Sequence, residues 1–376
     1  MNTSRPPFRA EHIGSLLRPP ALLQARNEFA TGAIDRQRLT AAENEAIRNV
    51  VKLQEEVGLK VITDGEFRRG TYSDSFTISG ISGVAIELTE DTGYVSSTTH
   101  GHRMARRIPK VVDRIQWNGP QNAADFRFLK SVTDRTPNLT PKITLPGPCY
   151  IHYRAGRANI SRDAYPDLDA FWSDLTAAYG QEMRSLAEVG CTYLQIDETS
   201  LVKLGDPRVQ ALLKERGEDW RDLLKTYIGA VNAVVAAAPT GMTVGVHICR
   251  SQDPTWQSDV GYDPIAEPLF NDMKVGIYFL EYDNARSGSF APLRAVPPGK
   301  VVVLGLVASK VPELEAAELL KRRIEEASRY VKLEQLALSP QCGFSTSASE
   351  HIGISEEMER AKLARIVEVA REVWGD

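Results

Sequence analysis

The chain has 376 residues, 42% of them hydrophobic, and is therefore long enough to bury a large core. Its net charge of −4 and pI near 6.0 give no general attraction to nucleic acid or to an anionic membrane. No apolar run approaches the ~18 residues of a membrane span. The first residues lack the apolar core of a secretory signal, and four cysteines are too few for a disulfide framework. We therefore expect a cytoplasmic protein with reduced thiols.

Apolar runs alternate with helical patterns almost throughout the chain. In chain order the runs are FRAEHIGSL (8–16), LKVITDGE (59–66), PKITLPGP (141–148), TYLQIDET (192–199), TVGVHICR (243–250), GIYFLEYD (276–283), VVVLGLVAS (301–309) and QLALSPQC (335–342). Amphipathic stretches lie at 40–58, with Thr40 as a candidate helix N-cap, and at about 168–190, 208–238, 311–330 and 355–374.

Eight strands alternating with helices predict an α/β fold, a single (β/α)8 TIM-type barrel that occupies residues 1–376 as one domain. In such a barrel the functional side chains gather at the carboxyl ends of the strands. An open doubly wound sheet is the alternative, but no G-x-G-x-x-G motif follows an early strand.

Residues 76–130 interrupt this regular alternation. They combine β-branched alternation with turn residues and show no long helical pattern, which predicts a β-hairpin insertion after the second strand, close to the active face. The insertion is rich in basic side chains: His100, His102, Arg103, Arg106, Arg107, Lys110 and Arg114. A run of charge is usually a solvated face, and an anion-binding lid is the alternative interpretation.

Four candidate metal ligands stand at the ends of predicted strands. His247 and Cys249 are two residues apart and so point the same way from one strand, while Glu281 and Cys342 end two others. Imidazole, thiolate and carboxylate ligands together suit zinc. A lone histidine or buried cysteine is more often structural, and we expect this of the remaining cysteines, Cys149 and Cys191.

Carboxylates also follow the strands. Glu66 and Asp197 would form a negative pocket beside the metal, suited to a cationic amine or to hydrogen bonding around the ligands. Asp64, Glu198 and Asp283 lie in similar places, where helix caps and salt bridges are the alternative. For Glu198 and Asp283 the two interpretations are equally consistent with the sequence. Ser15 could donate to a carboxylate or sulfonate, or could cap the helix that follows it.

These motifs, in this order, resemble the cobalamin-independent methionine synthase family, specifically single-barrel forms similar to its C-terminal catalytic domain. The resemblance runs from HIGSLLRP (12–19) through TDGEFRR, LQIDETS, HICR and FLEYD to LSPQCGF. It implies a zinc cofactor held by His247, Cys249, Glu281 and Cys342, a substrate thiol activated as thiolate, and attack by that thiolate on an electrophilic carbon. It further implies that Ser15, Glu66 and Asp197 bind homocysteine.

Three departures from the family pattern bear on the second substrate. The Gly-Asn pair usual after HVCR is replaced by Ser251 and Gln252; the segment LPGPCYIHYR has no pterin-stacking tryptophan; and LVASK has no histidine acid. Epoxyalkane:coenzyme M transferases, of the same zinc superfamily, need no pterin site, and Arg103, Arg106 and Arg107 would suit the sulfonate of coenzyme M.

The sequence narrowly favours this epoxide opening over methyl transfer to homocysteine, although Glu66 and Asp197 suit homocysteine better. A non-catalytic, ligand-binding barrel with structural zinc is the alternative of another class. The expected partners are a small-molecule thiol and an electrophilic alkyl donor, with no nucleic acid and no membrane, and a homo-oligomer is compatible with the sequence.

Overall fold

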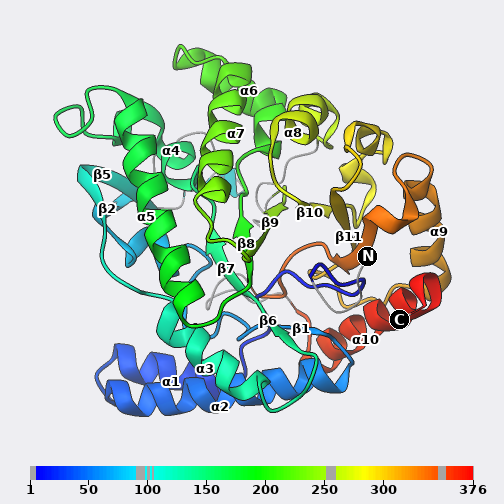
Figure 1. The fold of residues 1–376 in the computed structure, drawn as a ribbon. Coiled ribbons are helices and arrows are strands. Elements are labelled where there is room, and N and C mark those ends of the chain that lie inside the picture. Colours follow the sequence, from blue (N-terminus) through cyan, green and yellow to red (C-terminus); the bar gives the residue numbers. More distant parts are fainter. Residues whose placement is uncertain are drawn as a thin grey trace.

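A curved parallel sheet forms the centre of the computed structural model, which describes residues 6–89, 98–99, 102–103, 106–250, 260–345 and 353–375 (Figure 1). Six strands follow one another in the order β12-β11-β10-β9-β8-β7, and β1 pairs with β6. Their bounds are β1 (Val61–Ile62), β6 (Thr140–Pro141), β7 (Ile143–Pro146), β8 (Tyr193–Asp197), β9 (Thr243–Ile248), β10 (Ile277–Glu281), β11 (Val301–Val307) and β12 (Leu336–Pro340). All these pairings are parallel, as expected when helical crossovers join the strands.

The first apolar run, residues 8–16, connects the two edges of this sheet. On one side Ala10 forms a parallel bridge with Leu338 of β12, and on the other Ser15 forms one with Gly65, just after β1. β6 and β7 are two parts of one strand, interrupted at Lys142, whose backbone N–H still donates to Ile62 O at 2.8 Å. The eight predicted runs therefore all lie in the ring, and the predicted TIM-type barrel is confirmed.

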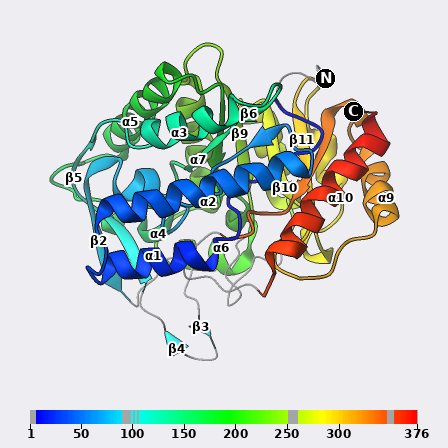
Figure 2. The same cartoon turned by 90° about the horizontal axis from the view of Figure 1, so that it is seen from below.

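Helices surround the strands (Figures 1 and 2). They are α1 (Pro20–Ala30), α2 (Arg36–Glu56), α3 (Ala123–Thr133), α4 (Tyr150–Ala155), α5 (Leu168–Glu188), α6 (Pro207–Glu215), α7 (Trp220–Ala236), α8 (Ala266–Asp272), α9 (Ala317–Ser328) and α10 (Glu356–Trp374). Short 3-10 or π turns occur at Asp74–Ile78, Gly156–Asn159, Val202–Gly205, Asp263–Ile265, Ala285–Ser287, Ala291–Ala295 and Leu333–Gln335. None of the helices in the described part of the chain is both long and apolar enough to cross a membrane.

Side-chain caps set several helix starts. Asp167 and Asp219 accept from the first backbone N–H groups of α5 and α7, and Asp35 accepts from Arg38 N in α2. The predicted N-cap Thr40 is wrong, because the helix begins a turn earlier behind Asp35 and Thr40 lies inside it. The short polar side chain of Asp35 accepts from a backbone N–H group of the first turn that has no partner within the helix. Thr40 lies one turn further on, where the backbone N–H groups already bond within the helix.

The inside of the barrel is packed solid below its mouth. Inward-facing side chains from alternate strand positions form a separate cluster: Phe8, Ile13, Val61, Tyr193, Ile277, Phe279, Val301, Val303 and Ala337. Strand residues of the opposite alternation, such as Leu280 and Leu304, belong to the larger cluster of buried residues that the helices share. The barrel is therefore a filled core, with chemistry confined to its ends.

The predicted hairpin is present after the second barrel strand. β2 (Ile81–Thr89) pairs antiparallel with β5 (Arg106–Trp117), and β3 (Thr98–Thr99) pairs with β4 (His102–Arg103). The register shifts at Gly83 of β2, which lies opposite residues 112–115 of β5. Its φ of +78° and the 2.5 Å distance from a would-be Cβ to Arg114 O leave room only for glycine. The base of the hairpin contacts α4 and α5.

The predicted lid range, 76–130, needs one correction. Its end is not hairpin, because α3 (Ala123–Thr133) begins seven residues before Lys130 and buries Phe126 and Leu129. The sequence AADFRFLKSVT is too short for its helical period to stand out beside the β-branched pattern before it. Its two phenylalanines, which also suit a strand, obscure that period further. The placement of the hairpin over the mouth stays a prediction, since residues 90–97 and 100–101 lie outside the described residues.

Glu359 of α10 is a buried carboxylate whose effect on stability can be measured. It is 1% exposed, and Oε1 accepts from Leu17 N at 2.9 Å, while Oε2 has no hydrogen-bond partner among the described residues. Burial raises the pKa of Glu359 to about 8, well above its ordinary value of 4.5. Because its pKa is higher in the folded state, the charged carboxylate costs stability as pH rises through this interval.

We therefore expect Glu359→Gln to increase the free energy of unfolding, by ~3 kcal/mol more at pH 8 than at pH 5. Glutamine keeps the oxygen that accepts from Leu17 and removes the titrating charge. Urea unfolding at the two pH values measures the difference, with the exposed Glu357→Gln on the same helix as control. If Glu359→Gln changed the free energy of unfolding equally at both pH values, the charge of Glu359 would not be the source of the penalty.

Candidate metal centre

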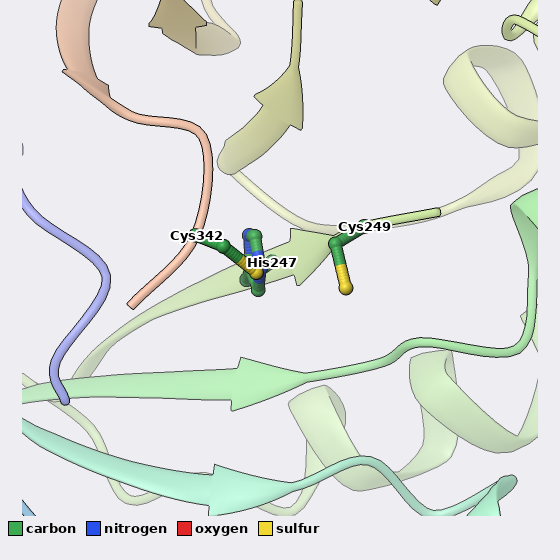
Figure 3. A group of neighbouring side chains, drawn as sticks. All are labelled: His247, Cys249 and Cys342. Carbon is green, nitrogen blue, oxygen red and sulfur yellow. The ribbon is translucent and has the colours of Figure 1, made fainter. Parts of the chain in front are cut away.

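One imidazole and two thiols converge at the carboxyl end of the barrel strands. His247 is the penultimate residue of β9, Cys249 directly follows that strand, and Cys342 lies two residues beyond β12 (Figure 3). Their ligand atoms all lie within 4.8 Å of one another, and His247 Nε2 is 3.4 Å from Cys342 Sγ. All three side chains are buried. The structure thus brings together three of the four residues predicted as metal ligands.

Hydrogen bonds and charge couple the three side chains of this cluster. A hydrogen bond from Cys342 lowers the pKa of Cys249 well below its ordinary value, and the same bond raises that of Cys342. Burial lowers the pKa of His247, but its hydrogen bond to Cys249 and the charge there outweigh burial and raise it. Two soft sulfur donors and an imidazole, gathered out of water within 4.8 Å of one another, fit a zinc ion.

Glu281, the predicted fourth ligand, is engaged elsewhere. It ends β10 but does not belong to the group of converging ligand atoms among the described residues. Its Oε2 accepts from the backbone N–H of Arg250 at 2.9 Å, and its Oε1 accepts from Arg250 Nη2 at 3.0 Å. The pair is buried, and burial raises the pKa of Glu281 although Arg250 opposes that shift. Its role as a metal ligand therefore stays a prediction.

Two further carboxylates lie beside the cluster. Asp197 ends β8 and is the register partner of His247 on β9. Burial raises the pKa of Asp197 to about 7; the charge of His247 opposes this shift, and repulsion from Glu66 adds to it. Glu66 is 3% exposed; its Oε1 accepts from Thr144 Oγ1 at 2.7 Å, and its Oε2 has no hydrogen-bond partner among the described residues. Both acids are thus close and buried, and Glu66 Oε1 also lies 3.6 Å from Arg69 Nη1 in a buried ion pair.

The backbone of Glu66 supports this placement. It has a φ of +62°, a left-handed conformation that is unusual for any residue other than glycine. Arg18 holds the turn, because its Nη2 donates to Glu66 O at 3.0 Å and to Arg69 O at 3.2 Å. Strained backbone of this kind persists where the surrounding structure fixes it, and it concentrates at functional sites.

Ser15 lies against the chain that carries Cys342. It is 4% exposed, and its backbone oxygen accepts from Phe344 N at 3.0 Å. A Cβ added to Gly343 would clash with Ser15 Oγ, so glycine is required next to Cys342. Ser15 is therefore buried beside the thiol cluster and caps no helix, because α1 begins at Pro20 behind Pro19. Its predicted contact with a substrate carboxylate stays a prediction.

The remaining predicted site residues fall outside this arrangement. Arg103 lies in β4, and Arg106 and Arg107 begin β5, but their side chains are not among the described atoms. Of the same basic cluster, Lys110 pairs with Glu87 and Arg114 with Asp174 in partly exposed salt bridges. His100, Ser251 and Gln252 lie outside the described residues. Sulfonate binding by the hairpin is therefore an untested prediction.

Three of the acids left open by the sequence have structural partners. Glu198 accepts from the backbone of Cys149 and Ser200, and from the Ser200 hydroxyl. Asp64 Oδ1 accepts from Glu66 N at 2.9 Å, and Asp283 lies 3.6 Å from Arg250. These acids shape turns around the site.

Sequence reasoning missed Gln195, Thr144 and Arg69, which contact the two acids. Gln195 Nε2 donates to Asp197 Oδ1 at 2.7 Å, and Arg69 Nη1 donates to Thr144 Oγ1 at 2.9 Å. The available signal was the strand alternation, since Gln195 precedes Asp197 by two residues and so lies on the same inward side.

The fold and the donor set define the class of protein: a (β/α)8 barrel with a histidine and two cysteines gathered at the carboxyl ends of its strands. The family model for the cobalamin-independent synthase catalytic domain matches residues 8–372. The chain therefore belongs to this family, as the sequence motifs predicted.

Two relatives of similar length are the Bacillus subtilis proteins YxjG and YxjH, both described as uncharacterised. YxjG is 37% identical to the chain, and the alignment covers 100% of the chain and 97% of YxjG. YxjH is 35% identical, and the alignment covers 98% of the chain and 95% of YxjH. A methionine synthase of Pyrococcus abyssi is 25% identical over 94% of this chain and 91% of its own.

A solved structure from Listeria monocytogenes, provisionally described as a vitamin-B12 independent methionine synthase, superposes with a TM-score of 0.76 at 33% identity. The superposition covers 98% of this chain and 99% of that one.

Proposed function

We propose that the protein transfers a methyl group to the thiol of homocysteine or a closely similar amino thiol, with zinc as cofactor. The observation that carries the proposal is the position of Asp197 beside the converging His247, Cys249 and Cys342. The thiol bound at the metal and the ammonium group bound at the acids would then be two ends of one substrate molecule. Family membership and relatives named methionine synthase support the reaction class.

This proposal reverses the narrow preference that the sequence gave to epoxide opening. Coenzyme M has no amine, and its sulfonate would meet the buried charge of Glu66 and Asp197 at unfavourable cost. The missing pterin tryptophan and histidine acid still favour a donor other than methyl-folate. Epoxyalkane:coenzyme M transfer therefore stays the second candidate, and a binding barrel with structural zinc the third.

Each residue has a defined task in the proposed reaction. His247, Cys249 and Cys342 would hold zinc, which when bound lowers the pKa of a thiol so that the thiolate persists at neutral pH. Asp197 and Glu66 would receive the ammonium group, and Ser15 the carboxylate. The sulfur then forms a bond to the methyl carbon while the bond from that carbon to the donor breaks, and the donor leaves with the electron pair. Arg250 holds both oxygens of Glu281, so that Glu281 would join the zinc only by giving up this pairing.

A binding experiment separates the three candidate functions. Zinc-loaded protein titrated with homocysteine should release about one proton per site, and X-ray absorption should show one more sulfur neighbour at ~2.3 Å from zinc. Coenzyme M should produce neither change at the same concentration. A response to coenzyme M alone would favour the epoxide reaction, and an unchanged zinc shell with both thiols would favour structural zinc.

A further inference from the structure

A row of hydrogen-bonded polar side chains runs along the inside of the barrel toward Asp197. At its inner end Glu11 accepts from Tyr193 Oη at 2.9 Å and pairs with Lys142 Nζ at 3.3 Å. Lys142 Nζ also donates to Gln195 Oε1 at 3.0 Å, and Gln195 Nε2 donates to Asp197 Oδ1 at 2.7 Å. Glu11, Lys142 and Gln195 have no measurable exposure, and Tyr193 has none either. This row lies outside the cluster of metal-binding candidates.

The lysine determines which end of the glutamine amide faces the site. An ammonium group donates and never accepts, so the amide oxygen must point to Lys142 and the NH2 group must point away from it. The backbone oxygen of Ile13 takes the second amide hydrogen, with Gln195 Nε2 at 2.5 Å. Both hydrogens of Gln195 are therefore assigned, and one of them reaches Asp197 Oδ1.

This donor fixes one oxygen of Asp197 and leaves the other for a ligand. The same division occurs at Glu66, where Thr144 donates to Oε1 and Oε2 is buried without a partner among the described residues. Two carboxylates, each anchored through one oxygen, thus present their second oxygens within a buried region. A hydrogen-bond donor placed between them, such as an ammonium group, would meet preorganised acceptors.

We propose that Gln195, oriented by Lys142, is a positioning residue that aims Asp197 at the amino group of the thiol substrate; this rests on the proposed function. Lys142 matters because without it the amide could rotate and present its oxygen to Asp197. The specificity for an amino thiol then depends on a residue that touches no substrate atom.

The test compares two ligands that differ by the amino group alone. Zinc-loaded protein is titrated calorimetrically with homocysteine and with γ-mercaptobutyrate, which is homocysteine without its amine. The wild-type protein should prefer homocysteine. In Gln195→Met we expect that preference, the ratio of the two dissociation constants, to fall about tenfold because a hydrogen bond to a charged group is lost. Affinity for γ-mercaptobutyrate should not change.

Gln195→Asn keeps an amide in the buried site but is one methylene too short to span from Lys142 to Asp197. It should reduce the preference in the same direction, which keeps the proposal testable if Gln195→Met fails to fold. Tyr193→Phe is the matched control, because it removes a hydrogen bond from the other end of the same row. It should leave the ratio unchanged, with zinc content and melting temperature reporting the state of each protein.

The outcomes are distinguishable. Unchanged preference in both glutamine variants overturns the positioning role, and so does an equal loss of affinity for the two ligands, which indicates general damage. If the wild-type protein itself binds both ligands equally, the amine is not recognised, and the proposed function fails together with this inference.

Discussion

Replacing either converging cysteine, as Cys249→Ser or Cys342→Ser, is expected to remove stoichiometric zinc and the activity that depends on it. Complete structural zinc sites bind with ~10–16 kcal/mol, so one of three or four ligands is worth roughly 3 kcal/mol, a weakening of zinc affinity on the order of 10²-fold or more. Serine is close in size to cysteine but is a poor zinc ligand at neutral pH, and it therefore tests the sulfur alone.

The chain supplies its own controls for this experiment. Cys149 and Cys191 are equally buried, and each thiol lies near a backbone oxygen, Tyr227 O at 3.7 Å and Tyr193 O at 3.5 Å. Neither thiol belongs to the group of converging ligand atoms among the described residues, and burial raises the pKa of both. Cys149→Ser and Cys191→Ser should retain zinc, measured by atomic absorption after dialysis against a competing chelator. Full zinc in the Cys249 and Cys342 variants would disprove the site.

Neutralising the acids, as Asp197→Asn and Glu66→Gln, is the second change for which we expect a large effect. Each variant should weaken homocysteine binding by about 10- to 100-fold, since a charge-assisted contact contributes ~1.5–3 kcal/mol. Zinc content should stay at one per chain, because neither residue belongs to the converging ligand group. Calorimetry on zinc-loaded protein measures the affinity.

A stability measurement separates lost binding from lost folding. Asp197 is buried, and desolvation together with repulsion from Glu66 costs stability in the absence of a ligand. Asp197→Asn should consequently unfold at the same urea concentration as the wild type or at a higher one. Glu66→Gln also gives up the ion pair with Arg69 at 3.6 Å, so its unfolding curve is the control for its binding result. Strong homocysteine binding by the double variant would refute the assignment of the amine to this pair.

The strands could be predicted from the sequence because most of them are short, largely apolar runs. Runs such as VVVLGLV and GIYFLEYD fit only between two layers of packed side chains. Gly58 and Gly190, with φ values of +91° and +89°, mark the ends of the helices that precede two of the strands. The order of the runs then fixed the ring, and strand alternation placed His247 and Cys249 together.

What the sequence could not supply was the direction of long polar side chains. Glu281 ends its strand as predicted, yet it turns to Arg250, and that choice depends on an arginine rotamer. Thr144, which donates to Glu66, and Lys142, which donates to Gln195 beside Asp197, likewise come from another part of the sheet and are brought close only by the closed ring. Helix α3 was missed because eleven residues give too few turns for a clear period.

The three converging residues come from distant parts of the chain, and this has a consequence for biosynthesis. His247 and Cys249 leave the ribosome almost a hundred residues before Cys342, whose strand, β12, must also pair with the first run at Ala10. A nascent chain that stops short of Cys342 offers two zinc ligands, and two hold the ion far more weakly than three. On the proposed function, zinc would thus be captured only by finished chains whose first and last strands have met, so that metal content reports completed synthesis.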